Sequence, residues 1–147
     1  MIIKPVLTDS WIQRFKKLAV HVSDWSKDPN AKIGAVIIDE HRRPVGLGYN
    51  GFPYGVRDDI RLDKEEKLDM IIHAEENAIL IAGNSSRHGT IFVVGKPICS
   101  RCAGIVIQAG IKEVFAQRPN DPESKWFKTG KKAIEMFEEA EVKFTDI

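Results

Sequence analysis

Two short segments of this 147-residue chain contain residue types that serve metal and proton chemistry. Cys99 and Cys102 in "PICSRCAG" have the C-x-x-C spacing, which lets two thiolates reach one metal ion. His73 in "MIIHAEENAIL" adds a ligand of a second type, and Glu75 follows two positions later. Three ligands with one position open to water are typical of catalytic zinc, and a nearby carboxylate suits general acid–base catalysis. We therefore expect a zinc ion that activates water beside Glu75.

The candidate ligands are expected at the starts of two helices, one beginning near His73 and one in "CSRCAGIVIQAG" at residues 99–110. Free backbone N–H groups and the positive end of the helix dipole favour anions at such positions. The thiolates are thereby stabilised before a metal binds. Glu75 should lie one or two residues inside its helix, and Glu76 is an ordinary carboxylate of a first helical turn.

Simpler interpretations account for parts of this pattern. A C-x-x-C pair in a cytosolic protein is commonly a redox motif or a structural zinc site. A thioredoxin-like redox site leaves the His73–Glu75 pair unexplained. No fourth protein ligand is apparent, because His21, His41 and His88 have no companion at ligand spacing. An enzyme with catalytic zinc and a binding module with structural zinc both remain open at this point.

Alternating apolar patterns predict the elements that position these residues. Residues 8–30 should contain a helix whose core face carries the apolar side chains Trp11, Phe15, Leu18, Val22 and Trp25. Strands are expected in 32–39, 45–51, 90–95, 111–117 and 141–147. Further helices are expected in about 73–82, 99–110 and 126–140. The charged segment 61–70 should lead into the helix at 73–82. An initial hairpin followed by alternating strands and helices predicts a mixed sheet with helices on both faces. We expect a single domain spanning 1–147.

Composition limits the possible partners. The chain is 43% hydrophobic and 29% charged, as in ordinary soluble globular proteins, with a net charge of +1 and a pI near 7.8. This charge argues against nucleic acid as a partner but allows one basic pocket for a phosphate. No apolar run approaches the ~20 residues that span a bilayer, and no secretory leader is evident. We expect a cytoplasmic protein that does not bind membranes.

Four motifs in fixed order give the chain a resemblance to a known family. They are "SKDPNAKIGAVIID", "GLGYNGFPYGVRDD", "HAEENAIL" and "PICSRCAGIVIQAGIKEV", which cover roughly residues 23–117. The chain resembles the zinc-dependent deoxycytidylate (dCMP) deaminases of the cytidine deaminase superfamily, whose signature is H-x-E followed by P-C-x-x-C. The resemblance implies a three-layer α/β/α fold of the cytidine deaminase type, with a five-stranded mixed sheet that opens with a hairpin. It also implies hydrolysis of dCMP to dUMP and ammonia.

The resemblance assigns roles to individual residues. His73, Cys99 and Cys102 would hold one Zn²⁺ per subunit, and Glu75 would be the proton shuttle. Asn50 would contact the nucleotide sugar, and the backbone N–H of Ala74 the pyrimidine carbonyl. The cationic side chains offered by the sequence as candidates for the substrate phosphate are Lys27, Lys32 and Arg118.

The chain departs from the family pattern at two positions. Ile98 stands between Pro97 and Cys99, where the signature has proline directly before cysteine. Tyr54 occupies a position where relatives often carry a basic residue. The first change shifts the loop before the ligands, and the second bears on recognition of a nucleotide phosphate.

Relatives are commonly homo-oligomers, often hexamers, and some respond to a nucleoside triphosphate accompanied by Mg²⁺. The resemblance therefore implies a homo-oligomer and an effector site in the "GYNGFPYGVRDD" loop. Its candidate contacts are Arg57, Asp58 and Asp59.

Other functions share parts of this pattern. Free cytidine or deoxycytidine, or another nucleobase or nucleotide, would use the same metal chemistry. Deamination of a tRNA adenosine is disfavoured by the neutral net charge. A nucleotide-binding module with structural zinc is the alternative from a different class.

Overall fold

Five strands form one mixed sheet in the computed structural model, which describes residues 6–61 and 63–147. The strands are β1 (Gly34–Ile38), β2 (Pro44–Tyr49), β3 (Thr90–Val94), β4 (Glu113–Ala116) and β5 (Lys143–Asp146). Their order is β2-β1-β3-β4-β5, with β1 antiparallel to both neighbours and β3, β4 and β5 mutually parallel. The predicted mixed sheet with an initial hairpin is confirmed.

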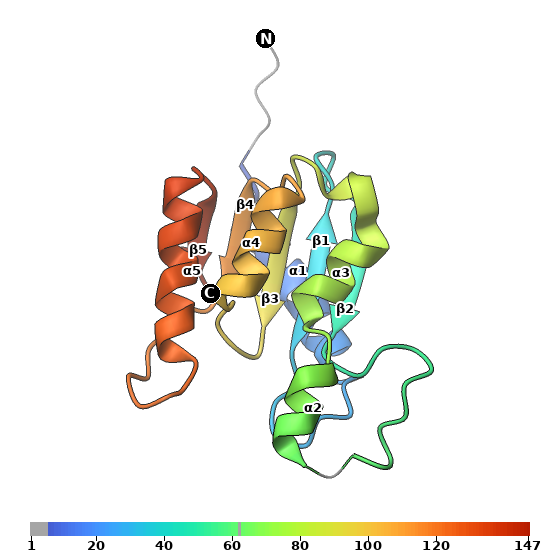
Figure 1. Ribbon diagram of the computed structural model, residues 1–147. Helices are drawn as coiled ribbons and strands as arrows, with labels where there is room; N and C mark the ends of the chain where they lie inside the picture. Colours follow the sequence, from blue (N-terminus) through green and yellow to red (C-terminus); the bar gives the residue numbers. More distant parts are fainter. Residues whose placement is uncertain (1–5, 62) are drawn as a thin grey trace.

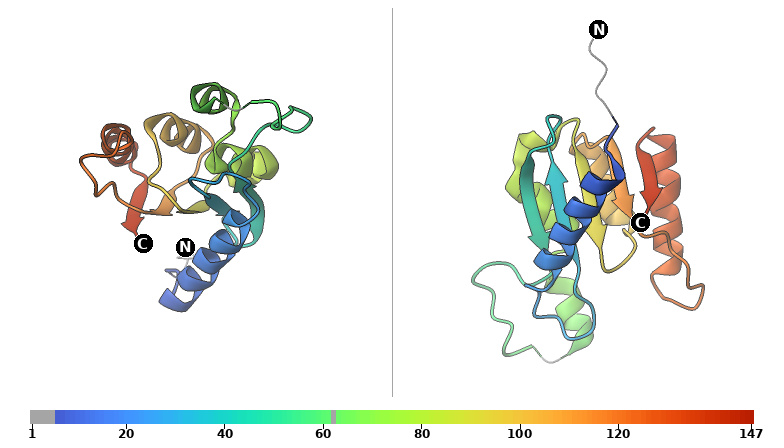
Figure 2. Two further views of the ribbon diagram at one scale, coloured as in Figure 1. Left: turned by 90° about the horizontal axis from the view of Figure 1, so that it is seen from below. Right: turned by 180° about the vertical axis from the view of Figure 1, so that it is seen from behind.

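Helices cover both faces of the sheet (Figures 1 and 2). The helix α1 (Asp9–Ser23) lies on one face, while α3 (Ala74–Ala82), α4 (Ser100–Gln108) and α5 (Phe127–Glu139) lie on the other. A 3-10 turn, η1 (Gly83–Ser86), follows α3. The arrangement is the expected three-layer α/β/α fold.

The strand β1 separates two halves of the core. All five of its residues are buried. Because successive strand residues point to opposite faces, Ala35 and Ile37 pack toward α3 and α4, whereas Val36 and Ile38 pack toward α1. This continuous apolar run is typical of a strand covered on both faces.

Close contact between β2 and α3 sets the position of the helix that carries His73 and Glu75. A side chain at Gly48 would collide with the carbonyl oxygen of Ala74 and the backbone of Ala78. The Asn77 side chain donates a hydrogen bond of 2.8 Å to the Tyr49 carbonyl. Glycine at position 48 therefore lets the helix lie directly on the strand backbone.

The charged segment before α3 differs from its prediction. Residues expected to lead into that helix form a separate helix, α2 (Lys64–Met70), capped by the Asp63 side chain. The chain leaves α2 because Ile71 is extended (φ −74°, ψ 151°) and Ile72 pairs with Gly51 in a short antiparallel bridge. As a result, α2 lies at the end of the molecule where α3 and α4 begin (Figure 1).

The predicted core stripe of α1 is only partly correct. Phe15 and Val22 are buried, but Trp11 and Trp25 are 48% and 47% exposed. Trp25 lies beyond the end of α1 at Ser23, so the helical spacing no longer controls its direction. Trp11 lies in the first turn, where Arg14 rather than the sheet covers its ring, 4.5 Å from the ring centroid.

No helix among the described residues has the length and apolar character needed to cross a membrane.

Candidate active site

His73 is held at the start of α3 by its backbone neighbours. It is the N-cap residue, with extended backbone (φ −74°, ψ 155°). The Glu76 carboxylate accepts a hydrogen bond of 3.1 Å from the His73 N–H. The preceding residue, Ile72, exchanges backbone hydrogen bonds of 2.7 and 3.1 Å with Gly51. The imidazole therefore projects from a junction of two anchored segments, and Glu76, expected to be an ordinary carboxylate of the first turn, caps the helix.

Cys99 and Cys102 lie at the start of α4. Cys99 is the N-cap residue, and its sulfur accepts a bond of 3.5 Å from the Cys102 N–H. The Ser100 N–H donates to the Thr129 hydroxyl at 2.8 Å, which ties this turn to α5. Ile98, the extra residue of the signature, is only 2% exposed and belongs to the core. Burial of Ile98 accommodates the departure without separating the cysteines from His73.

The three candidate metal ligands converge as predicted. The Nδ1 atom of His73 lies 3.2 Å from Cys102 Sγ and 3.6 Å from Cys99 Sγ. One donor atom from each residue falls within 4.8 Å of the others. One imidazole nitrogen and two sulfurs, all at helix starts, form a donor set suited to Zn²⁺. Within residues 6–61 and 63–147 the cluster has these three members, and a tetrahedral zinc held by three protein ligands would have a fourth position for a water or substrate.

Hydrogen bonding distributes charge unevenly among the three ligands. The hydrogen bond from the Cys102 thiol, aided by one from His73, lowers the pKa of Cys99 to about 4. The hydrogen bond that the Cys102 thiol makes to Cys99, together with burial, raises the pKa of Cys102. The hydrogen bond between His73 and Cys99 raises the pKa of His73. Cys99 thus carries a thiolate at neutral pH while Cys102 retains its proton, which a metal ion would displace.

Glu75 lies in the first turn of α3 and is only 4% exposed. Burial raises the pKa of its carboxyl to about 7, because the charged form loses its hydration. A carboxyl with this pKa both accepts and donates a proton near neutral pH. Its place two residues from the candidate metal ligand His73 suits a general acid–base group.

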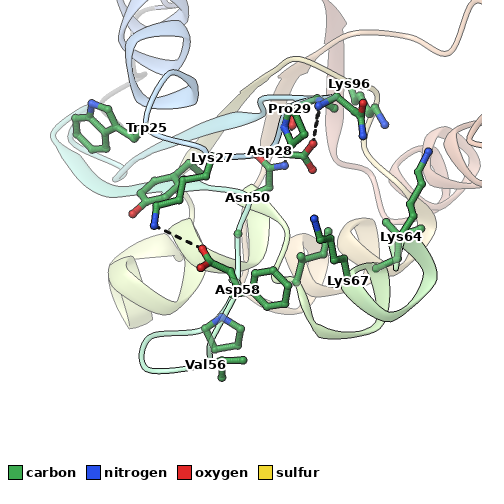
Figure 3. Close-up of a pocket in the computed structure, with 18 of the residues that line it drawn as sticks. Trp25, Lys27, Asp28, Pro29, Asn50, Val56, Asp58, Lys64, Lys67 and Lys96 are labelled. Atoms are coloured by element: carbon green, nitrogen blue, oxygen red, sulfur yellow. Dashed lines mark hydrogen bonds and ion pairs between the residues drawn. The ribbon is translucent and has the colours of Figure 1, made fainter. Parts of the chain in front are cut away.

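A cavity of about 600 Å³ lies near this cluster, although none of the candidate ligands nor Glu75 lines it (Figure 3 shows the cavity). Its lining includes Asn50, Gly51 and Ile71, and the bridge from Gly51 to Ile72 leads directly to His73. Trp25 and Trp126 also line it, so the tryptophan expected in the core of α1 contributes to the cavity instead. The volume is that of a typical small-molecule site.

Asn50 is a buried part of the cavity wall, at 3% exposure. Its side chain accepts a hydrogen bond from the Ile33 N–H and donates one to the Ala31 carbonyl, both at 2.9 Å. The Ser26 hydroxyl donates to the Asn50 carbonyl at 2.9 Å. Asn50 thus organises the loop that follows α1. One N–H and one lone pair of its amide stay available to a ligand.

The sequence candidates for phosphate and effector contacts separate in space. Lys27 and Asp58 line the cavity and form an ion pair of 3.5 Å (Figure 3). Lys32 is exposed and does not line the cavity, because the chain turns there into β1. Arg118 is also outside it, with its guanidinium 5.1 Å from the ring centroid of Phe144.

The remaining loop residues face solvent. Arg57 and Asp59 form an exposed ion pair in which the guanidinium donates two hydrogen bonds to the carboxylate, at 3.1 and 2.9 Å. Tyr54, at the position where relatives often carry a basic residue, is fully exposed and does not line the cavity. Of the three candidate effector contacts, only Asp58 lies at the cavity.

Sequence reasoning missed several cavity residues. They come from α2, from the connection between β3 and α4, and from the segment before α5: Lys64, Lys67, Lys96, Lys125 and Trp126. Trp126, just before α5, is half-buried. The only signal was the spacing of Lys64 and Lys67, one helical turn apart in a segment not expected to be a separate helix.

Comparisons with known proteins agree with this geometry. Residues 9–117 match the family described as "cytidine and deoxycytidylate deaminase zinc-binding region". An uncharacterized deaminase of Aliivibrio fischeri, in the luxG 3′ region, is 39% identical over 141 residues, which are 95% of each chain. Human deoxycytidylate deaminase is 40% identical over 112 residues, covering 71% of this chain and 63% of the human protein. The chain thus spans less than two thirds of the length of the human relative.

A solved structure shows the same fold. The dCMP deaminase of cyanophage S-TIM5, in complex with dCMP and dUMP, matches with a TM-score of 0.79 at 21% identity. The match covers 97% of this chain and 100% of the phage protein. The three-layer arrangement of the present chain is therefore that of a known deaminase fold.

Proposed function

Since the chain belongs to the cytidine and deoxycytidylate deaminase family, we propose that it hydrolyses dCMP to dUMP and ammonia. The observation that carries the proposal is the buried Glu75 carboxyl beside a converging His73–Cys99–Cys102 cluster. The relatives named as deoxycytidylate deaminases support the choice of substrate. The protein would be a hydrolase acting on the exocyclic amine of a cytosine nucleotide.

His73, Cys99 and Cys102 would hold one Zn²⁺ per subunit. When bound, zinc supplies a Lewis acid that lowers the pKa of water toward neutrality. The neighbouring α3 and α4 helix starts provide partial positive charge that favours the thiolate of Cys99, and of Cys102 once a metal has displaced its proton. This donor set fits the zinc-binding region named in the family description.

Glu75 would move the protons of the reaction. It takes one proton from the attacking water and delivers it to the ring nitrogen. It then takes the second proton from the hydroxyl formed at C4 and delivers it to the amine, which leaves as ammonia while the C4 carbonyl forms. The new bond joins the water oxygen to C4 of the ring, and the bond that breaks joins C4 to the amine nitrogen. Burial supports this role, because a pKa of about 7 keeps both protonation states accessible.

Substrate orientation would rest on the cavity wall. We assign the sugar contact to the Asn50 side chain and the contact with the pyrimidine carbonyl to the backbone N–H of Ala74, which is fully buried. Lys27 is the phosphate candidate from the sequence that lines the cavity. The positions of Lys32 and Arg118 do not support a phosphate role for them.

Assembly and regulation are further parts of the proposal. We propose one domain over 1–147, a cytoplasmic location and a homo-oligomer such as a hexamer, supported by the exposed Leu80 and Ile81 of α3. A nucleoside triphosphate with Mg²⁺ would act as effector. Asp58 is the effector candidate that lies at the cavity.

Ammonia release from dCMP, CMP, deoxycytidine and dCTP by the zinc-loaded protein tests the proposal. We expect the highest kcat/KM for dCMP. Preferential turnover of deoxycytidine would replace the nucleotide substrate by a nucleoside. Absence of turnover on all four substrates, with zinc bound, would overturn the proposal.

A further inference from the structure

The wall of the cavity carries more positive charge than one ion pair can balance. Five lysines line it, against the carboxylates of Asp28 and Asp58. Asp58 pairs with Lys27, and Asp28 accepts the backbone N–H groups of Asn30 and Ala31 at 2.8 and 3.2 Å. None of the ion pairs formed by the described residues includes the other four lysines, which are Lys64, Lys67, Lys96 and Lys125.

The short helix α2 is divided by charge into two faces. Lys64, Lys67, Leu68 and Ile71 follow helical spacing and all line the cavity. The acidic side chains of the same helix do not line it and are exposed: Glu65, Glu66 and Asp69. Since α2 has no buried residue, packing in the core does not explain this division.

Lys96 faces the same space from the connection between β3 and α4 (Figure 3). Its ammonium lies 5.2 Å from the ring centroid of Trp126, and that of Lys125 lies 5.0 Å from the same centroid. Partial burial lowers the pKa of Lys96; the charge of Asp28 opposes this, and the smaller effects of the nearby charges of Lys125 and Lys64 add to it. Mutual repulsion of these cations would be relieved by a bound anion.

We propose that α2 forms the phosphate-binding side of the cavity, with Lys64, Lys67 and Lys96 as the groups that hold the phosphate of the nucleotide. This inference rests on the proposed function, because the base must lie next to His73 and Glu75 for its amine to react. The phosphate then occupies the cavity away from that cluster, where the unpaired lysines lie. The helix α2 thereby determines the preference for a nucleotide over a nucleoside.

The test compares substrates with and without a phosphate. The double variant Lys64→Gln/Lys67→Gln should lose about 100-fold in kcat/KM for dCMP, about 10-fold for each charge-assisted hydrogen bond removed. Its kcat/KM for deoxycytidine should stay within about 2-fold of the wild type, because no contact to the base changes. A second variant, Lys96→Gln, removes one such bond and should lose about 10-fold in kcat/KM for dCMP with the same selectivity.

A matched control is Lys128→Gln/Lys132→Gln on α5, which removes two exposed charges that do not line the cavity. This control should retain the wild-type kcat/KM for both substrates. Equal losses in the control and the α2 variant, or equal losses for dCMP and deoxycytidine, would overturn the proposal. Assays with dCTP added to the panel distinguish a monophosphate site from a triphosphate site on the same lysines.

A binding measurement separates this inference from the proposed function. Calorimetry would compare dUMP and deoxyuridine, the products with and without phosphate, on the wild type and the α2 variant. The wild type could fail to turn over dCMP while the variant selectively loses dUMP binding. That result would refute the proposed deamination of dCMP and support the phosphate site on α2. If the wild type bound both products equally, the phosphate site itself would be refuted.

Discussion

Glu75 combines two properties that a surface carboxylate lacks. It is buried, so its pKa lies at about 7, and it follows a metal ligand by two positions in the first turn of α3. Glu76, its neighbour, is committed to the backbone N–H of His73. The adjacent carboxylates therefore differ: Glu76 caps the helix, and Glu75 is the one to which we assign the proton transfers.

Replacing Glu75 by glutamine should separate metal binding from catalysis. Glu75→Gln keeps the size and burial of the side chain, so we expect normal zinc content and folding but a kcat lower by about 10² to 10⁴. Zinc analysis and ammonia release on the same sample measure the two properties. Cys99→Ala is the companion variant and should lose zinc as well as activity. A Glu75→Gln variant with wild-type kcat would refute the proton-shuttle role.

Zinc affinity should depend on pH, because the ligands hold protons without the metal. Cys102 retains its proton at neutral pH through its raised pKa, and His73 becomes protonated below its own raised pKa. Zinc binding displaces these protons, so the apparent affinity should rise by about 10-fold per pH unit for each proton released. Calorimetry in buffers of different ionisation enthalpy measures the protons directly. Affinity independent of pH between 6 and 8 would contradict this charge distribution.

At the scale of elements, the site depends on where α3 and α4 begin. The α3 start is placed by β2 through Gly48 and by the Gly51–Ile72 bridge, and the α4 start is tied to α5 through Thr129. Helix starts at the same end of the sheet bring ligands from residues 73 and 99–102 together. The expected strands and helices around them were largely correct, while the separate α2 was not expected.

Gly48→Ala tests the packing of α3 against β2. The added methyl group collides with the Ala74 and Ala78 backbone, which cannot move away without displacing the helix. We expect a loss of about 1–3 kcal/mol in the free energy of unfolding, as in other overpacked cores, and weaker zinc binding. Urea unfolding and zinc titration provide the two measurements.

Gly104→Ala on α4 is the matched control for that substitution. Its added methyl group meets only the Met136 side chain, at 3.6 Å, an ordinary contact. Alanine is also the better helix former, so stability should be unchanged or increased. A Gly48→Ala protein as stable as this control would mean that β2 and α3 tolerate a wider spacing.

For the whole molecule, the metal site joins two helices of one layer. His73 belongs to the start of α3 and both cysteines to the start of α4, while α1 is the helix that the described residues place on the opposite face. Bound zinc would therefore add a cross-link to a layer otherwise held by apolar packing against the sheet. Metal binding and folding are coupled in such an arrangement.

Removal of zinc should lower the melting temperature. A ligand at 100 times its Kd stabilises the native state by about 2.7 kcal/mol. For a chain of this size this corresponds to roughly 5–10 °C. Scanning calorimetry with and without a chelator measures the shift, and His73→Ala serves as a control that should not respond to the chelator. An unchanged wild-type melting temperature would show that the site does not contribute to stability.

The sequence by itself identified the candidate metal ligands, the candidate catalytic carboxylate and most of the sheet. These features depend on residue types at short spacing: C-x-x-C, H-x-E and the alternation of buried strand residues each act within one element. Only the tertiary structure decided the cavity wall. Trp25, Lys64, Lys96 and Trp126 meet there although they are far apart in the chain, while Lys32 and Arg118 do not. Which side chains face a shared cavity depends on how distant segments pack, and local patterns do not record that packing.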